Sequence, residues 1–126
     1  MQHSDTHPEY WFDLARDDET SARILAREAG PPGIAAYHYH QAAEKMLKGL
    51  IAKRNMEIPR IHDLERLFRT AQKAGENPEE PAFDAVTLIQ SYYADLRYPR
   101  GDLIGVDDLT GIAAALDVLA KAIFKN

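Results

Sequence analysis

The sequence contains no cysteine among its 126 residues. It can therefore form no disulfide, thiolate nucleophile or zinc–thiolate site, and this composition suits a reducing compartment. It also lacks an apolar run near the roughly 20 residues that cross a bilayer, and its N-terminus lacks the basic start and apolar core of a secretory signal. These absences predict a protein that stays in the cytoplasm and makes no membrane contact, and the length of 126 residues predicts a single domain, residues 1–126.

Sustained alternation of polar and apolar residues is also missing, and five segments instead show helical periodicity. Prolines and glycines separate them, as in Gly30-Pro31-Pro32-Gly33. The expected helices are residues 8–29, 34–54, from Asp63 to the break at Gly75, 82–96, and from Asp107 or Asp108 to the chain end. The simplest way to bury their apolar stripes is an all-α fold, an antiparallel up-and-down four-helix bundle with one additional short helix, five helices in all.

The charge is spread unevenly along the chain. The formal net charge is −5, yet residues 45–69 carry seven basic against three acidic side chains, a local net charge of +4. Nearby charges outweigh those beyond a Debye length of about 10 Å, so this segment could form a local anion site. A solvated helix face with ion pairs four residues apart explains the same pattern.

The segment 34–54 has two faces at helical spacing. We expect the apolar face to pack and the polar face to be free to bind. The apolar face consists of Tyr39, Ala42, Ala43, Met46, Leu47, Leu50 and Ile51. The polar face consists of Gln41, Glu44, Lys45 and Lys48.

The histidine spacing does not favour a metal site. His38 and His40 are two residues apart, about 200° around a helix, so they cannot readily share one ion. His40 and Glu44 share a face, but such a pair is more often a surface hydrogen bond than half of a binding site. No third ligand is placed by spacing, so we expect neither a metal nor a cofactor.

The dipeptide His62-Asp63 lies at an expected helix start. Asp63 can cap the backbone N–H groups there, which explains the dipeptide without any function. Alternatively, the same N–H groups and the positive end of the helix dipole could bind a phosphate, with Arg60 or Lys45 nearby to neutralise it.

Arg97 closes the fourth expected helix, just before Tyr98 and Pro99. A cation in the last turn complements the helix dipole, although a guanidinium could equally hold a phosphate or a carboxylate. Asp18 lies on the apolar stripe of the first helix, where an unpaired carboxylate would be costly, and Arg97 is its suspected partner. Trp11 and the pair Tyr92-Tyr93 are expected in the core or a dimer interface.

Together, these motifs resemble those of the HEPN family of small helical domains. They are Asp18 with Ala15 and Ala22, Gln41-Ala42-Ala43-Glu44-Lys45 with Leu47-Lys48, His62-Asp63-Leu64, and Arg97-Tyr98-Pro99. The resemblance implies a helical bundle that forms homodimers, encoded beside a minimal nucleotidyltransferase. In such pairs the HEPN protein resembles the helical substrate-side domain of larger nucleotidyltransferases.

Many HEPN proteins are ribonucleases that use an arginine followed after four to six residues by a histidine. No histidine follows Arg97, and seven residues separate Arg54 from His62. We therefore expect a noncatalytic member with no catalytic residues. The resemblance implies a nucleotide or phosphate-bearing ligand at Lys45, Lys48, His62, Arg97 and Tyr98, with Asp18, Glu44 and Asp63 as structural polar partners. The alternatives are a ribonuclease toxin of a toxin–antitoxin pair, acting on RNA, and a purely structural helical adaptor.

Overall fold

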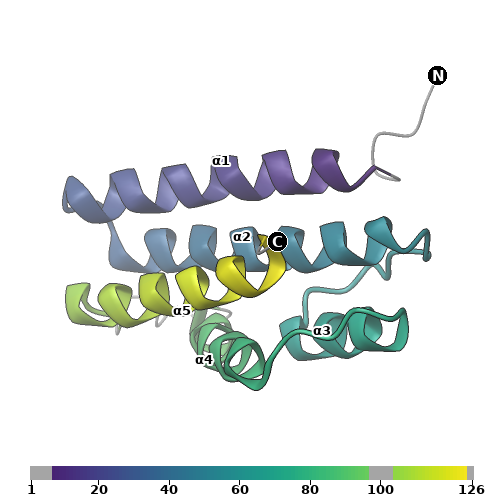
Figure 1. Cartoon of the computed structure of the whole chain (residues 1–126). Helices are drawn as coiled ribbons and strands as arrows, with labels where there is room; N and C mark the ends of the chain where they lie inside the picture. The colour runs from purple at the N-terminus through teal and green to yellow at the C-terminus, as the bar shows by residue number, and fades with distance from the viewer. Residues whose placement is uncertain (1–6, 97–103, 125–126) are drawn as a thin grey trace.

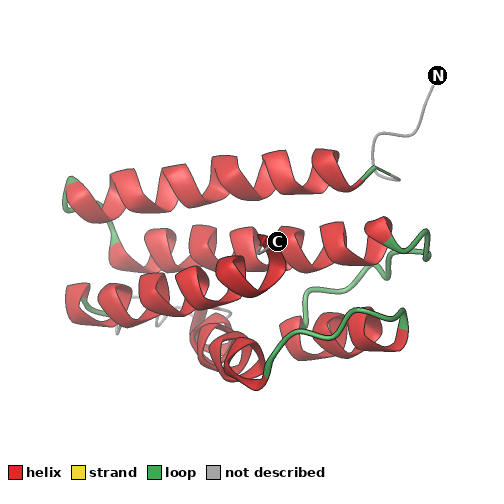
Figure 2. Ribbon diagram, viewed as in Figure 1, coloured by secondary structure: helices red, strands yellow, loops and turns green. Residues whose placement is uncertain are grey.

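The computed structural model describes residues 7–96 and 104–124, and the regular elements within these ranges are all helices (Figure 2). The prediction of an all-α fold with five helices is confirmed, and the expected bounds differ from the observed ones by a few residues. The helices are α1 (Pro8–Arg27), α2 (Pro32–Lys53), α3 (Leu64–Lys73), α4 (Glu80–Leu96) and α5 (Val106–Phe124).

Helix α2 occupies the centre of the bundle. Helix α1 lies along its length, and α3, α4 and α5 also contact α2 (Figure 1). Helix α4 is seen almost end-on in Figure 1, so it crosses the long helices steeply, and it packs against both α3 and α5. Because α2 has neighbours on most sides, little of its surface past the first two turns reaches solvent.

The core is built from the apolar stripes that the sequence predicts for α3 and α5. Side chains from α2 and α4 complete it, and their burial supplies the main favourable free energy of folding. The buried positions of α3 are Leu64, Leu67, Phe68 and Ala71. Those of α5 include Leu109, Ile112, Leu116, Leu119 and Ile123.

Helix α1 ends two residues earlier than expected. Its last residue is Arg27, and Ala29 has a φ of 58° in the left-handed region. This conformation lets the N–H of Gly30 donate to the carbonyl oxygen of Leu25 at 2.7 Å, which satisfies one of the last carbonyls of the helix. Ala29 is exposed and lies outside α1, although the expected helix 8–29 included it.

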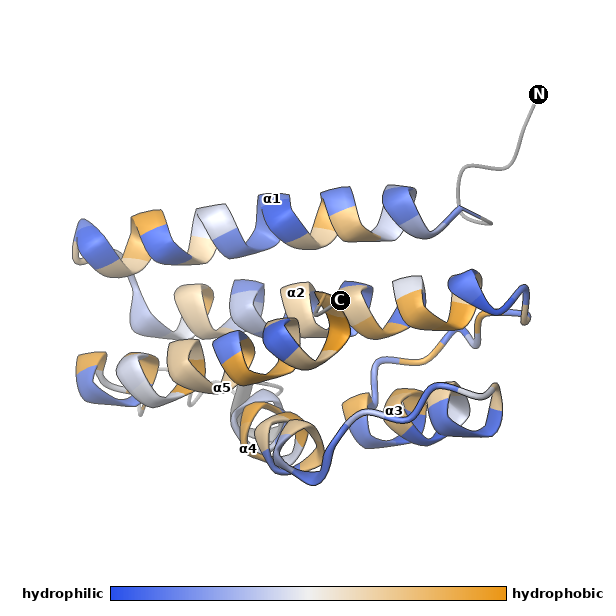
Figure 3. Ribbon diagram, in the orientation of Figure 1, coloured by the Kyte–Doolittle hydropathy of each residue, from blue (hydrophilic) through white to orange (hydrophobic). Residues whose placement is uncertain are grey.

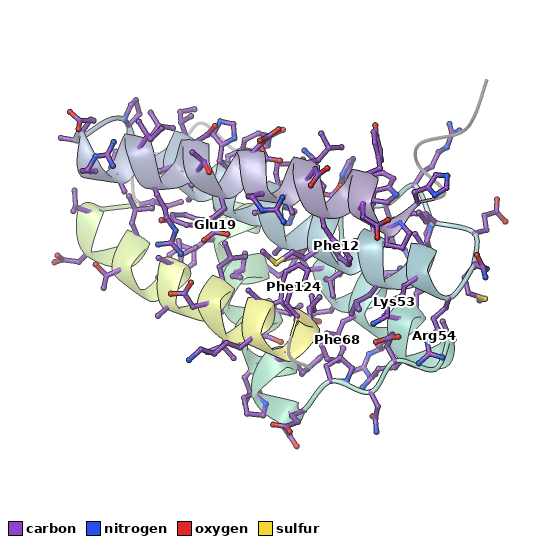
Figure 4. All side chains as sticks on the ribbon, turned by 45° about the horizontal axis from the view of Figure 1, so that its top comes forward. Phe12, Glu19, Lys53, Arg54, Phe68 and Phe124 are labelled. Carbon is purple, nitrogen blue, oxygen red and sulfur yellow. The ribbon has the colours of Figure 1, made fainter. Side chains whose placement is uncertain are left out.

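The end of α2 is tied to the turn that follows α3. The guanidinium of Arg54 donates to a carboxylate oxygen of Glu76 at 2.7 Å and to the carbonyl oxygen of Gly75 at 3.1 Å. Gly75 has a φ of 112°, a conformation that side-chain-bearing residues rarely adopt. Figure 4 shows Arg54 at this end of the molecule, near Lys53.

The helices differ in how polar they are along their length. Figure 3 shows hydrophilic residues recurring throughout α1, whereas α4 and α5 are richer in hydrophobic ones. Across residues 7–96 and 104–124, no helix combines the length with the apolar character that a membrane crossing requires.

Two helix-interior glycines offer a test of the α1–α2 packing. A Cβ atom at Gly49 would lie 2.3 Å from a ring carbon of Phe12, whereas a Cβ at Gly111 would have no neighbour within 4 Å. The Phe12 ring packs edge-on against Phe124, with 4.9 Å between ring centroids, so a Cβ at Gly49 would have to displace this ring from its packed position (Figure 4).

We expect Gly49→Ala to destabilise the protein by about 1 kcal/mol, because overpacking costs roughly 1–3 kcal/mol and the gain in helix propensity returns about 1 kcal/mol. The matched variant Gly111→Ala should be more stable than wild type by about 0.5–1 kcal/mol. Urea unfolding of both variants measures the two changes, and changes of the same sign would contradict the packing described here.

Candidate functional site

The polar face of α2 is covered rather than free. The side chain of Glu44 is 4% exposed and that of Lys48 is 10% exposed, and both face other protein groups. The prediction that this face is available for binding is therefore wrong for Glu44 and Lys48, whereas Gln41 and Lys45 are partly exposed. The reason is that α1 lies alongside it and brings Asp18 and Trp11 over the two lysines.

Glu44 is the centre of a buried polar network. Its carboxylate accepts a hydrogen bond from Nζ of Lys48 at 2.9 Å, and Nδ1 of His62 lies 3.1 and 3.2 Å from its two oxygens. The ammonium of Lys48 also lies 5.5 Å from the ring centroid of Trp11, in a cation–π contact. Glu44 thus connects α2 to the loop after it, and Lys48 extends the connection to α1.

A second network surrounds Asp18 of α1. One carboxylate oxygen accepts from Nζ of Lys45, and the other lies 3.1 Å from Nδ1 of His38. The carboxylate is therefore paired, as its place on an apolar stripe required. Its partners come from α2, and the suspected partner Arg97 lies outside the described residues.

The start of α3 is closed by side chains. Oδ1 of Asp63 accepts from the backbone N–H groups of Glu65 at 3.0 Å and Arg66 at 3.2 Å, which confirms the expected cap. The N–H of Leu64 donates to Oε1 of Gln90 in α4 at 2.8 Å. Because these three donors are occupied, the alternative of a phosphate bound to the helix N-terminus is wrong.

His40 is the most deeply buried imidazole, with 1% of its surface exposed. Its ring stacks on Tyr93 of α4, with 3.8 Å between centroids and 17° between planes. Nδ1 lies 4.0 Å from Oε1 of Glu44, and neither ring nitrogen makes a hydrogen bond to a described residue. The expected surface hydrogen bond between His40 and Glu44 is therefore wrong, because both groups are inside the bundle.

Burial lowers the pKa of His40 from its ordinary value of 6.5 to about 4, and the negative charge of Glu44 offsets only part of this effect. The imidazole is consequently neutral near pH 7. The stack on Tyr93 packs α4 against the middle of α2.

The structure brings some of the predicted ligand residues together and separates others. Lys48 and His62 meet at Glu44, whereas Lys45 belongs to the Asp18 network. Arg97 and Tyr98 lie outside the described residues.

Sequence reasoning missed the roles of His38 and Gln90. The sequence did carry a signal for His38. It lies seven residues before Lys45, which is two helical turns, so both side chains lie on the same face of α2. Asp18 needed a hydrogen-bond donor for each of its two oxygens, and these two residues supply them. Gln90 gave no comparable signal, since its contact with Leu64 depends on how α4 crosses α3.

Several cavities lie away from these networks, and two of them are lined by aromatic rings. One of about 370 Å³ is lined by Phe68 and Arg69 of α3 and Phe83 of α4, with the guanidinium 5.0 Å from the Phe83 ring centroid. Another of about 220 Å³ is lined by Phe12 and Phe124 among others. The predicted ligand residues line neither cavity. Over the described ranges, no three histidine, aspartate or glutamate side chains gather in a group that could hold a metal ion.

The buried ion pair predicts a stability pattern. Lys48→Met should cost about 3 kcal/mol, because it leaves the buried Glu44 carboxylate without its cation. The double variant Glu44→Leu with Lys48→Met should regain most of that loss, since no buried charge remains, and Lys53→Met on the exposed surface should change little. Urea unfolding compares the three. A double variant as unstable as the single one would contradict this account.

The burial of His40 predicts that the free energy of unfolding falls in acid. Its pKa is near 6.5 in the unfolded chain and about 4 in the folded one, so the unfolded state binds the proton first and stability falls as pH drops from 6.5 towards 4. The loss should be about 3 kcal/mol. His40→Phe, which keeps the stack on Tyr93, should flatten this dependence in unfolding measured at pH 7, 5.5 and 4. An equally steep loss of stability in the variant would show that groups other than His40 cause it.

Comparisons with known proteins give the architecture a family. The model of the HEPN domain matches residues 8–121. A crystal structure of an archaeal HEPN homologue superposes with a TM-score of 0.71 at 22% sequence identity, covering 92% of this chain and 94% of that chain. No curated protein sequence matches this chain significantly. A match that spans all five helices, from the start of α1 into the last turn of α5, means that the chain belongs to the HEPN domain family.

Proposed function

We propose that this protein is a noncatalytic HEPN module that binds a nucleotide or another phosphate-bearing ligand and acts with a separately encoded minimal nucleotidyltransferase. The observation that carries the proposal is the exposed loop between α2 and α3. His62 is 61% exposed there, yet its ring is anchored on the buried Glu44. Such an anchored imidazole is a preorganised binding group.

The cations for the phosphates come from this loop and from the first turn of α3. Arg60 lies two residues before His62, and Arg66 lies in the first turn of α3. Both are exposed, and neither forms an ion pair with another described residue. Guanidinium groups bind phosphate oxygens through paired N–H donors, so two uncommitted ones favour an anionic ligand.

The two lysines of the expected site pair with carboxylates of the protein and do not contact the ligand in this proposal. Lys45 neutralises Asp18, and Lys48 neutralises Glu44 and through this carboxylate helps to hold His62 in place. Arg97 and Tyr98, expected at the ligand from the family resemblance, follow directly on α4, whose Tyr93 stacks over His40.

The noncatalytic assignment rests on residue spacing. The arginine–histidine spacing typical of HEPN ribonucleases is absent from the sequence, so the usual general base for 2′-hydroxyl chemistry is missing. We further propose a homodimer. Exposed apolar side chains on α4 and α5, Leu88 and Val118 among them, support a contact through these two helices.

The binding proposal is tested by calorimetry with ATP, GTP and a short RNA. We expect saturable binding to the wild-type protein that is about 10- to 100-fold weaker in Arg97→Ala and in the double variant Arg60→Ala with Arg66→Ala, because each charge-assisted hydrogen bond contributes roughly 1.5–3 kcal/mol. Arg16→Ala, an exposed arginine of α1 paired with Asp13, is the control and should bind as wild type does.

Absence of binding to all three probes would refute nucleotide binding and turn attention to the adaptor alternative. Cleavage of the RNA by metal-free protein would instead refute the noncatalytic assignment. Co-purification with a nucleotidyltransferase encoded beside this chain tests the partner.

A further inference from the structure

The same three-part arrangement occurs twice on the polar face of α2. In each case one carboxylate contacts a lysine ammonium and Nδ1 of a histidine. Asp18 joins Lys45 and His38, and Glu44 joins Lys48 and His62. The two differ in exposure, because the His38 side chain is 29% exposed and the His62 side chain is 61% exposed.

This contact decides which nitrogen of His62 carries the proton. An ionised carboxylate can only accept hydrogen bonds, so the nitrogen that faces Glu44, Nδ1 at 3.1 Å, must be the donor. A neutral imidazole has one N–H, and Nε2 is then left with a lone pair. In the neutral ring Nε2, the nitrogen that does not contact Glu44, is therefore a hydrogen-bond acceptor.

An acceptor cannot be the group that binds phosphate. Phosphate oxygens are themselves acceptors, and the backbone donors at the start of α3 are occupied by Asp63 and Gln90. The charge of Glu44 is already balanced by Lys48, so the pair adds no net positive charge beside His62. Any phosphate must accordingly bind to the arginines, and His62 must contact a different part of the ligand.

We infer that Nε2 of His62 accepts a hydrogen bond from an uncharged donor of the nucleotide, either a ribose hydroxyl or an exocyclic amine of the base. The inference rests on the nucleotide binding proposed above and reassigns His62 from the phosphates to the neutral part of the ligand. Glu44 is a positioning residue that fixes the tautomer, and Lys48 keeps that carboxylate compatible with burial.

The test compares ATP with two analogues at pH 8, by calorimetry. 2′,3′-Dideoxy-ATP lacks the ribose hydroxyls, and ITP has a carbonyl oxygen in place of the exocyclic amine. Wild-type protein should bind one of the analogues three- to tenfold more weakly than ATP, as expected for one exposed hydrogen bond. The analogue affected identifies the donor.

Two variants that replace an imidazole with a phenyl ring distinguish the role of His62 from that of His38. His62→Phe should bind ATP and the affected analogue equally, because the acceptor is gone. His38→Phe removes the matching imidazole from Asp18 and should keep the wild-type discrimination. Circular dichroism verifies that both variants fold.

Three results would overturn the inference. In the first, the wild-type protein binds all three nucleotides equally, and His62→Phe lowers the affinity for inorganic triphosphate. His62 would then bind phosphate, and the proposal of nucleotide binding would stand. If ¹⁵N NMR shows the proton of His62 on Nε2, the tautomer is wrong whatever the affinities. If no nucleotide or triphosphate binds, the proposed function fails and this inference fails with it.

Discussion

The contact that organises this protein is the burial of the Glu44 carboxylate inside a helix bundle. A carboxylate removed from water needs both charge compensation and hydrogen bonds, and Lys48 and His62 supply them. To do so, α2 must present Lys48 on the same face, and the loop after α2 must return over that face. The path of the chain between α2 and α3 is therefore constrained by one side chain of the central helix.

Much of the fold could be predicted from the sequence because the apolar stripes are clear. In α3 the spacing of Leu64, Leu67 and Phe68 indicated both the helix and its buried side. The end of α1 was misjudged, because Ala29 can continue a helix by propensity and only the turn geometry with Gly30 shows that it does not. Propensity is local, whereas this helix end depends on the chain beyond it.

The candidate site could be predicted only in part, because the sequence did not show which polar side chains are buried. Periodicity places Glu44 and Lys48 on a polar face, and polar faces are usually solvated. In this bundle, α1 covers that face, so residues expected to bind a ligand became partners of each other. The residue types and spacings were therefore informative about which groups meet, but the sequence alone carried no information on how many helices surround α2. Asp18 was an exception, because a carboxylate on an apolar stripe already requires a buried partner.

The contact between Leu64 and Gln90 has a consequence for how the bundle opens. The first N–H of a helix has no acceptor within its own helix, and such an amide normally exchanges its hydrogen with water readily. Here the acceptor belongs to α4, so the amide of Leu64 is protected only while α3 and α4 stay docked. Its hydrogen-exchange rate would therefore report the separation of these two helices even while α3 itself remains helical. A single backbone amide can in this way distinguish undocking of α3 from its unfolding.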